Sequence, residues 1–167
     1  MVDFKKDTWI YVLIAGILLI ISVFTPASTW VYDFSALGAP NIDISSWLSG
    51  SISQVDGDWA GVAASTYLLG VALICATLLL TFGILSWKGT ELKWDWLVYL
   101  LCGIGLIIFP ILYFVFAAPP NIYADLGLPV TVEDTMVSFA PIGILISGII
   151  VIAAFALDKF GDRGAGA

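Results

Sequence analysis

The sequence predicts an all-α integral membrane protein: a four-helix transmembrane bundle with a small extracellular antiparallel β-sheet formed by its outer loops. Three observations predict this fold class. Of the 167 residues, 60% are hydrophobic and 11% are charged, whereas a soluble domain has about 45–50% apolar and about 25% charged residues. Four apolar runs are long enough to cross a hydrocarbon core of about 30 Å. No charged residue falls inside these runs.

The four runs divide the chain into nine segments. We place the spans at residues 8–24, 61–87, 96–118 and 136–157. Segments 1–7, 88–95 and 158–167 then lie on one side of the membrane, and loops 25–60 and 119–135 lie on the other. The first span has an alternative interpretation as a cleavable secretory signal, because two lysines precede it and small residues follow it. Asp3 and Asp7 argue against that alternative, since they cancel the positive charge that a signal requires.

The charges predict the orientation. All six cations lie on one side of the predicted membrane: Lys5, Lys6, Lys88, Lys93, Lys159 and Arg163. The positive-inside rule makes this side cytoplasmic, so we expect a multi-pass protein of the cell membrane with both termini in the cytoplasm. The outer loops carry only acids: Asp33, Asp43, Asp56, Asp58, Asp125, Glu133 and Asp134. An outer partner is therefore expected to be basic or bridged by a cation.

Tryptophans lie near the ends of the predicted spans, as expected for an aromatic belt at the lipid headgroups. The belt candidates are Trp9, Trp87, Trp94 and Trp96 on the inner side and Trp59 on the outer side. The outer loops also contain strand patterns. Apolar and polar residues alternate over residues 30–35, and Ile42 and Ile44 flank Asp43. Residues 52–55 and 129–133 predict two further short strands.

Small residues predict how the helices pack, because lipid gives helices no hydrophobic reason to associate and close approach must replace it. A stripe of four small residues follows one face of the second span: Thr66, Gly70, Thr77 and Thr81. Gly103 in the third span, and Gly143 with Ser147 in the fourth, predict further contacts. The helices are expected to form a compact bundle, or the same stripes receive another membrane subunit or a second copy. Pro110 is expected to kink the third span.

The sequence argues against catalysis. Because there is no histidine, the commonest general base and transition-metal ligand is missing, and no cofactor is expected. Coupled transport is disfavoured because no ionisable residue lies at membrane depth. Asp56 and Asp58 are a weak calcium candidate, with a solvated acidic loop as the simpler interpretation. Nucleic acid is excluded as an outer partner because the outer loops lack any basic residue. Cys75 and Cys102 are expected to be buried thiols, or a disulfide if their helices are neighbours.

The layout resembles the claudin and PMP22 type of tetraspan protein. The resemblance rests on four spans, cytoplasmic termini, a long first outer loop with strands and a shorter second one. Trp30 matches the first tryptophan of that family's outer-loop signature, whereas residues 46–48 read Ser-Trp-Leu in place of Gly-Leu-Trp, and the loop has no cysteine pair. The resemblance implies a bundle capped by a sheet and a role in cell adhesion or barrier formation.

Elimination of chemical sites leaves a non-enzymatic structural or accessory subunit as the leading functional hypothesis. Such a subunit works through helix packing in the lipid bilayer and through its outer domain. The alternatives are claudin-like adhesion, a passive channel or carrier, and a lipid-modifying enzyme.

Overall fold

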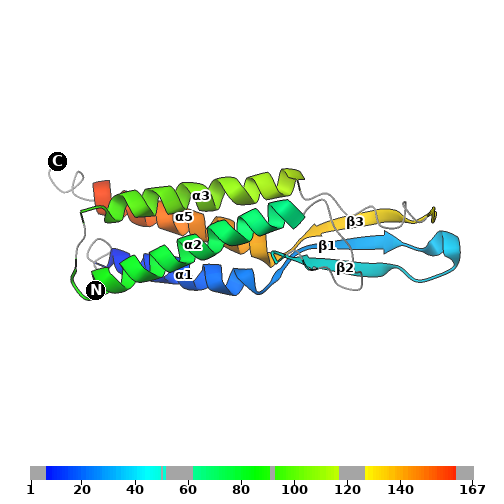
Figure 1. The fold of residues 1–167 in the computed structure, drawn as a ribbon, viewed down its shortest axis with the longest axis horizontal. Coiled ribbons are helices and arrows are strands. Elements are labelled where there is room, and N and C mark those ends of the chain that lie inside the picture. The colour runs from blue at the N-terminus through cyan, green and yellow to red at the C-terminus, as the bar shows by residue number, and fades with distance from the viewer. Residues whose placement is uncertain (1–6, 50, 52–61, 91–92, 117–126, 161–167) are drawn as a thin grey trace.

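The described residues form four α-helices and a three-stranded sheet (Figure 1). A computed structural model describes residues 7–49, 51, 62–90, 93–116 and 127–160. The helices are α1 (Thr8–Val23), α2 (Val62–Trp87), α3 (Asp95–Phe116) and α5 (Phe139–Phe160). The strands are β1 (Pro26–Asp33), β2 (Ile42–Trp47) and β3 (Thr131–Val137), and a short 3₁₀ helix, η1 (Ser35–Leu37), follows β1.

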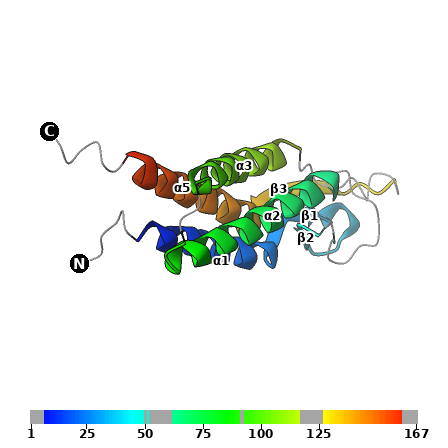
Figure 2. The same ribbon diagram turned by 60° about the vertical axis from the view of Figure 1, so that its left-hand side comes forward.

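The molecule is elongated, with the helices side by side and the sheet extending beyond one end of the bundle (Figures 1 and 2). We call this the sheet end, and the opposite end, where α1 begins and α5 ends, the terminal end. Helix α1 packs against α2 and α5, and α3 packs against the same two helices. The four described helices thus form a closed ring in which α2 and α5 lie diagonally opposite each other.

Three of the helices, α2, α3 and α5, are long and apolar enough to cross a membrane. Helix α1 is also apolar but has only 16 residues. At 1.5 Å per residue it measures about 24 Å, which is shorter than the hydrocarbon core. The prediction of membrane-spanning helices therefore holds, by length and composition, for three of the four.

The start of α5 differs from the sequence expectation. The fourth span was placed at residues 136–157, but Met136 and Val137 belong to β3 and the helix begins at Phe139. The reason is pairing with β1. Val137 is aligned with Ser28, and the Ser138 amide donates a hydrogen bond to the Ala27 carbonyl, which keeps the chain extended up to the helix. At its other end α5 continues to Phe160.

The sheet has the strand order β2-β1-β3, and both pairs are antiparallel. Strand β1 begins at Pro26, directly after α1, so the predicted strand at residues 30–35 starts earlier and ends earlier than expected. Residues 42–44 lie in β2, and the strand expected at 129–133 is displaced toward the helix as β3. The strand expected at residues 52–55 lies outside the described residues.

The alternation in β1 places its large side chains on one face of the sheet. Trp30, Tyr32 and Phe34 are buried together with Ile44 of β2. Val130 and Val132 pack against the same cluster. The opposite face carries Asp43, Val31 and Asp134 in one row across the three strands. The sheet therefore has a core of its own on one face and a charged surface on the other.

A second core fills the bundle and continues into the base of the sheet. It contains Leu19, Leu79 and Leu106 from the helices, and Ala27 and Leu48 from the segments that join the sheet. A buried hydrogen bond of 2.9 Å between the Ser28 and Tyr113 hydroxyls joins β1 to α3. Pro110 lies within α3, which continues as one helix on both sides of it.

Candidate functional site

Glycines allow the helices to approach closely at several contacts. A methyl group built at Gly16 of α1 would lie 2.8 Å from Leu80 Cδ2 of α2, and one at Gly83 would lie 2.7 Å from Leu13 Cδ2. Because real carbon atoms do not approach so closely, each glycine fits a side chain of the neighbouring helix. The α1–α2 contact is therefore built on a reciprocal pair of glycines.

The packing residues predicted on the third and fourth spans lie at such contacts. A methyl group at Gly103 of α3 would lie 2.6 Å from Ile152 Cδ1 of α5. Gly143 of α5 lies against Ser22 of α1. Ser147 is buried, and its hydroxyl donates to the Gly143 carbonyl at 2.9 Å. These three predicted residues lie inside the bundle, where they contribute to the α3–α5 and α1–α5 contacts.

The stripe predicted on the second span lies mainly on the exposed side of α2. Thr66, Thr77 and Thr81 are exposed, and a methyl group at Gly70 would meet no described atom within 4 Å. Helix α2 instead packs into the bundle through a different set of small residues: Ala72, Ala76 and Gly83, all of which are buried. Among the described residues the stripe therefore makes no close helix contact of the kind expected. The second interpretation, that it receives another subunit, stays a prediction.

Sequence reasoning missed Gly16, Gly83 and Gly148. The buried face of α2 does carry a signal, because Ala72 and Ala76 form a small-xxx-small pair and Gly83 falls on the same side at 100° per residue. Gly148 is close to the Leu106 backbone of α3, 3.0 Å from a built methyl group. It has no small partner four residues away in α5, so pattern alone does not reveal it.

The hydroxyls on the exposed α2 face are satisfied within the helix. Thr77 donates to the Leu73 carbonyl at 2.9 Å, and Thr81 donates to the Thr77 carbonyl at 2.7 Å. Beside this face lies a groove of about 650 Å³ at the junction of α1, α2 and β2. Its lining residues are mainly apolar: Val23, Phe24, Trp47, Ser49, Ser51, Leu69 and Leu73. Leu73, which is exposed and whose carbonyl accepts the Thr77 hydroxyl, lines this groove, so the groove adjoins the exposed α2 face.

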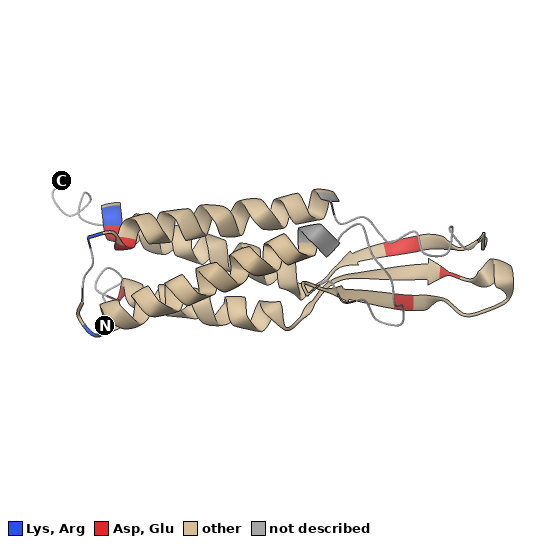
Figure 3. Ribbon diagram, viewed as in Figure 1, with Lys and Arg blue, Asp and Glu red and all other residues tan. Residues whose placement is uncertain are grey.

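The sheet end is acidic, and the described cations lie at the terminal end (Figure 3). Four carboxylates project from the sheet and its margins: Asp33, Asp43, Glu133 and Asp134. The Asn41 side-chain amide donates to Glu133 Oε2 at 2.6 Å. Hydrogen bonds from Ser35, including its backbone amide at 2.7 Å, lower the pKa of the Asp33 carboxyl from its ordinary value.

Carboxylates of the described sheet do not assemble into a metal site. Among the described residues no group of three or more His, Cys, Asp or Glu side chains is placed to hold an ion. The weak calcium candidates Asp56 and Asp58 lie outside the described residues. The described carboxylates of the sheet are therefore dispersed over its surface.

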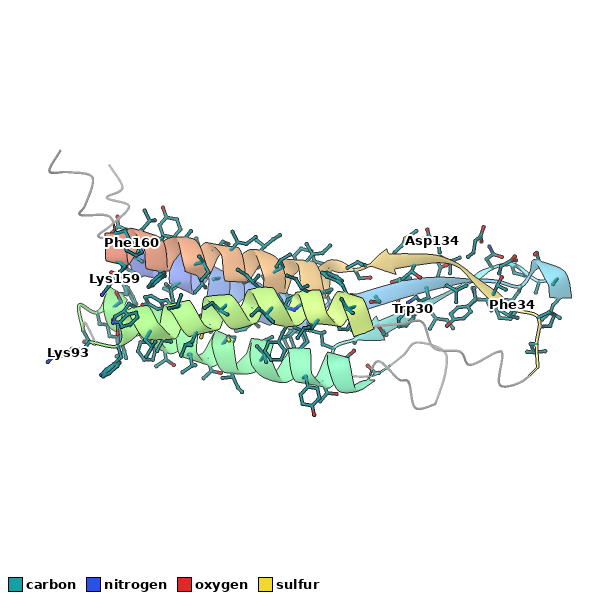
Figure 4. All side chains as sticks on the ribbon, turned by 90° about the horizontal axis from the view of Figure 1, so that it is seen from above. Trp30, Phe34, Lys93, Asp134, Lys159 and Phe160 are labelled. Carbon is teal, nitrogen blue, oxygen red and sulfur yellow. The ribbon has the colours of Figure 1, made fainter. Side chains whose placement is uncertain are left out.

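Aromatic side chains gather at the terminal end of the bundle. The Trp9 and Trp87 rings are 6.1 Å apart, and the Lys159 ammonium lies 4.8 Å from the centre of the Trp96 ring. Trp94 is exposed at the start of α3. Figure 4 shows Lys93 and Lys159 at this end, and Trp30, Phe34 and Asp134 at the sheet end. The belt candidate Trp59 lies outside the described residues.

Cys75 of α2 and Cys102 of α3 are both buried free thiols. Helices α2 and α3 are in contact, and both thiols are free rather than joined in a disulfide. Cys75 and Cys102 join the α2–α3 contact, where they pack as small side chains.

The described residues thus comprise four helices, three of them long and apolar enough to cross a membrane, and an acidic three-stranded sheet at one end. Comparison of the sequence with protein-family models and with characterised proteins gives no match. Two surfaces of the described residues are available to a partner of the chain: the exposed α2 face with its groove, and the sheet.

Proposed function

We propose that this chain is a non-enzymatic membrane protein with four spans that acts as a structural or accessory subunit. The observation that carries the proposal is the exposed small-residue face of α2. Gly70 leaves open space there, and the Thr77 and Thr81 hydroxyls are bonded to their own helix. In lipid, helices associate by close packing at small residues. A face of this kind that the chain's own bundle does not use suits the helix of a partner.

Helix α1 is proposed as the fourth span. It runs beside α2 and α5 from the terminal end to the sheet end (Figures 1 and 2). A bilayer that encloses its two neighbours would therefore enclose α1 as well. Its 16 residues leave a mismatch of a few ångströms, which local thinning of the bilayer accommodates at modest cost.

The sheet is proposed to lie outside the cell and the terminal end in the cytoplasm. The support is the charge distribution, since the described cations Lys88, Lys93 and Lys159 all lie at the terminal end. Single cysteines introduced as Ala36→Cys or Thr90→Cys, in a background without the native thiols, test this orientation. An impermeant maleimide should label the first in intact cells and the second only after permeabilisation; the reverse pattern refutes the proposed orientation.

Adhesion through like sheets is the second candidate, supported by the position of the sheet beyond the bundle (Figure 1). The acids weigh against it. Two copies that met through their sheets would bring Asp43 and Asp134 of one molecule toward the same residues of the other, and like charges repel. The accessory role requires no such contact, and we therefore prefer it.

The test is recovery of a defined complex from native membranes in mild detergent. Tagged wild-type protein should migrate as a heteromeric complex of fixed stoichiometry. The Gly70→Leu and Thr77→Leu variants add bulk to the exposed α2 face and should lose the partner. Ala153→Leu adds similar bulk to an exposed position of α5 and is the matched control. Recovery of wild-type monomer alone, or equal loss in the control, contradicts the proposal.

A further inference from the structure

Strand β3 forms an open edge of the sheet. It pairs with β1 along one side only, and along its other side the described residues provide no backbone partner. Six of its seven residues are exposed, and only Val132 is partly covered. An edge of this kind presents N–H and C=O groups at every second residue that can pair with another strand. One backbone donor of β3, the Thr135 amide, is already bonded to the side chain of Asp134.

Two features hold β3 in position without covering this edge. Val132, with Val130 before the strand, packs against the buried cluster around Trp30. At the other end, Val137 is aligned with Ser28 of β1. The strand is thus fixed by its inner side chains and by β1. A partner strand would pair with an edge that is already formed. Only the partner would therefore lose conformational freedom on binding.

The side chains of the edge are acidic at its middle. The register with β1 shifts between Val31 and Tyr32, which leaves Glu133 as an extra residue on β3. Glu133 accepts a hydrogen bond from Asn41, and Asp134 accepts one from the Thr135 amide at 2.7 Å. Both carboxylates are exposed. The Asn41 contact draws the Glu133 carboxylate toward the β2 side of the sheet, but both acids belong to the strand with which a new strand would pair, so they make its surroundings negative.

The same charges decide which strand fits. Antiparallel pairing of β3 with β3 of a second copy, over its whole length of Thr131–Val137, would set Asp134 opposite Asp134. Like charges directly opposite each other destabilise a strand pair, and opposite charges stabilise it. A bulge and acidic residues are also devices that protect an edge against self-pairing. A basic strand from another protein avoids the charge repulsion, although it must still pair with an edge that contains the bulge at Glu133.

We propose that the edge of β3 binds a basic extended segment of another protein by strand addition, with Lys or Arg side chains beside Glu133 and Asp134. This inference rests on the proposed accessory function and names the chemistry of its partner. Backbone hydrogen bonds to β3 supply binding, and the carboxylates select basic over acidic segments.

The test uses the full chain in nanodiscs of zwitterionic phosphatidylcholine, which gives a basic peptide no anionic lipid to bind. The probe is a nine-residue capped peptide of alternating lysine and threonine. It should bind, should slow the hydrogen exchange of about half of the β3 amides, and should be displaced by salt. A peptide with glutamate in place of lysine should not bind. Binding of both peptides, or unchanged exchange in β3, overturns the proposal.

Two peptides with N-methyl groups on alternate residues separate strand addition from simple charge attraction. They keep the charge of the parent but remove the amide donors of one side, so one of the two should lose at least tenfold in affinity. Equal affinity of all three peptides would show that the backbone edge is not used and would overturn the proposal.

The protein variants locate the site. A double variant with Glu133→Gln and Asp134→Asn keeps both hydrogen-bond acceptors and should weaken the probe by about 2- to 30-fold, as expected for two exposed ion pairs. Asp43→Asn, on the opposite edge strand, is the matched control and should change affinity less than twofold. Equal weakening by the control overturns the assignment to β3. Because the isolated chain is used, the result is independent of whether α2 binds a membrane partner.

Discussion

The strongest prediction concerns two helix glycines whose replacement by alanine should have opposite effects. Gly148 of α5 faces α3, and a methyl group there would lie 3.0 Å from Ile107 Cγ1 and from the Leu106 backbone carbon. Gly70 of α2 faces outward, where a methyl group meets no described atom within 4 Å. Both substitutions change the same residue type within a helix, so intrinsic helix propensity affects them alike.

The expected magnitude follows from two contributions. Alanine in place of glycine favours a helix by about 0.5–1 kcal/mol. At Gly70 only this gain applies, so Gly70→Ala should raise the free energy of unfolding of the isolated chain. At Gly148 the gain is opposed by overpacking, which costs about 1–3 kcal/mol. The backbone of α3 cannot rotate aside as a flexible side chain would. The two variants should therefore differ by about 1–3 kcal/mol, with Gly148→Ala the less stable.

The assay is reversible unfolding in mixed micelles of a mild detergent and dodecyl sulfate, followed by tryptophan fluorescence. The difference between the two variants is the informative quantity, because the propensity contribution cancels. Equal stability, or a more stable Gly148→Ala variant, would refute the packing of α3 on α5 described above.

Three further predictions concern contacts elsewhere in the chain. A double-mutant cycle with Ser28→Ala and Tyr113→Phe should give a coupling free energy of about 0.5–1.5 kcal/mol in the same unfolding assay, and zero coupling would contradict the buried hydroxyl contact. Mild oxidation by copper phenanthroline should cross-link Cys75 to Cys102 within the chain, visible as a mobility change absent from either single alanine variant; no cross-link would contradict the α2–α3 contact. The lowered pKa of Asp33 means that its carboxylate stabilises the folded turn at pH values above the ordinary 3.8, and that this contribution is lost as the pH falls through the lower folded value. A carboxyl carbon NMR titration should show the lowered pKa, and a value at or above 3.8 would contradict it.

The sequence was sufficient for the helices and for most of the sheet, because hydropathy and alternation are local signals. It was insufficient at the β3–α5 junction. Met136, Val137 and Phe139 are all apolar, and a hydropathy window does not separate the end of an apolar strand from the start of an apolar helix. The boundary is set by a non-local contact, the pairing of Val137 with Ser28 more than a hundred residues earlier.

The sequence also did not reveal which small-residue face of α2 packs inside the bundle, for a related reason. In a soluble protein the buried face of a helix is the apolar one, but α2 is apolar all round, so composition does not tell the inside from the outside. Two small-residue faces were available, one containing Gly70 and Thr77 and the other Ala72 and Ala76. On the side of the second face, Gly83 receives Leu13 of α1, while Gly16 of α1 receives Leu80 of α2. Such complementarity between helices is visible only once both are placed.

The two proposed surfaces lie on different sides of the sheet. The groove beside the exposed α2 face reaches Trp47 of β2, whereas the open edge belongs to β3, and β1 separates the two strands. With strands about 4.8 Å apart, β2 and β3 are separated by only about 10 Å.

A single partner can place a helix against α2 and a basic segment on β3. Once it is bound at one surface, its second segment is held close to the other surface and binds there at high effective concentration. Loss of either surface should then reduce the overall affinity by about 10²- to 10⁴-fold, far more than the isolated peptide would lose. Two independent partners would instead show no such coupling: Gly70→Leu would leave binding of the β3 partner unchanged. Measuring the affinity of the recovered complex for both classes of variant distinguishes one partner from two.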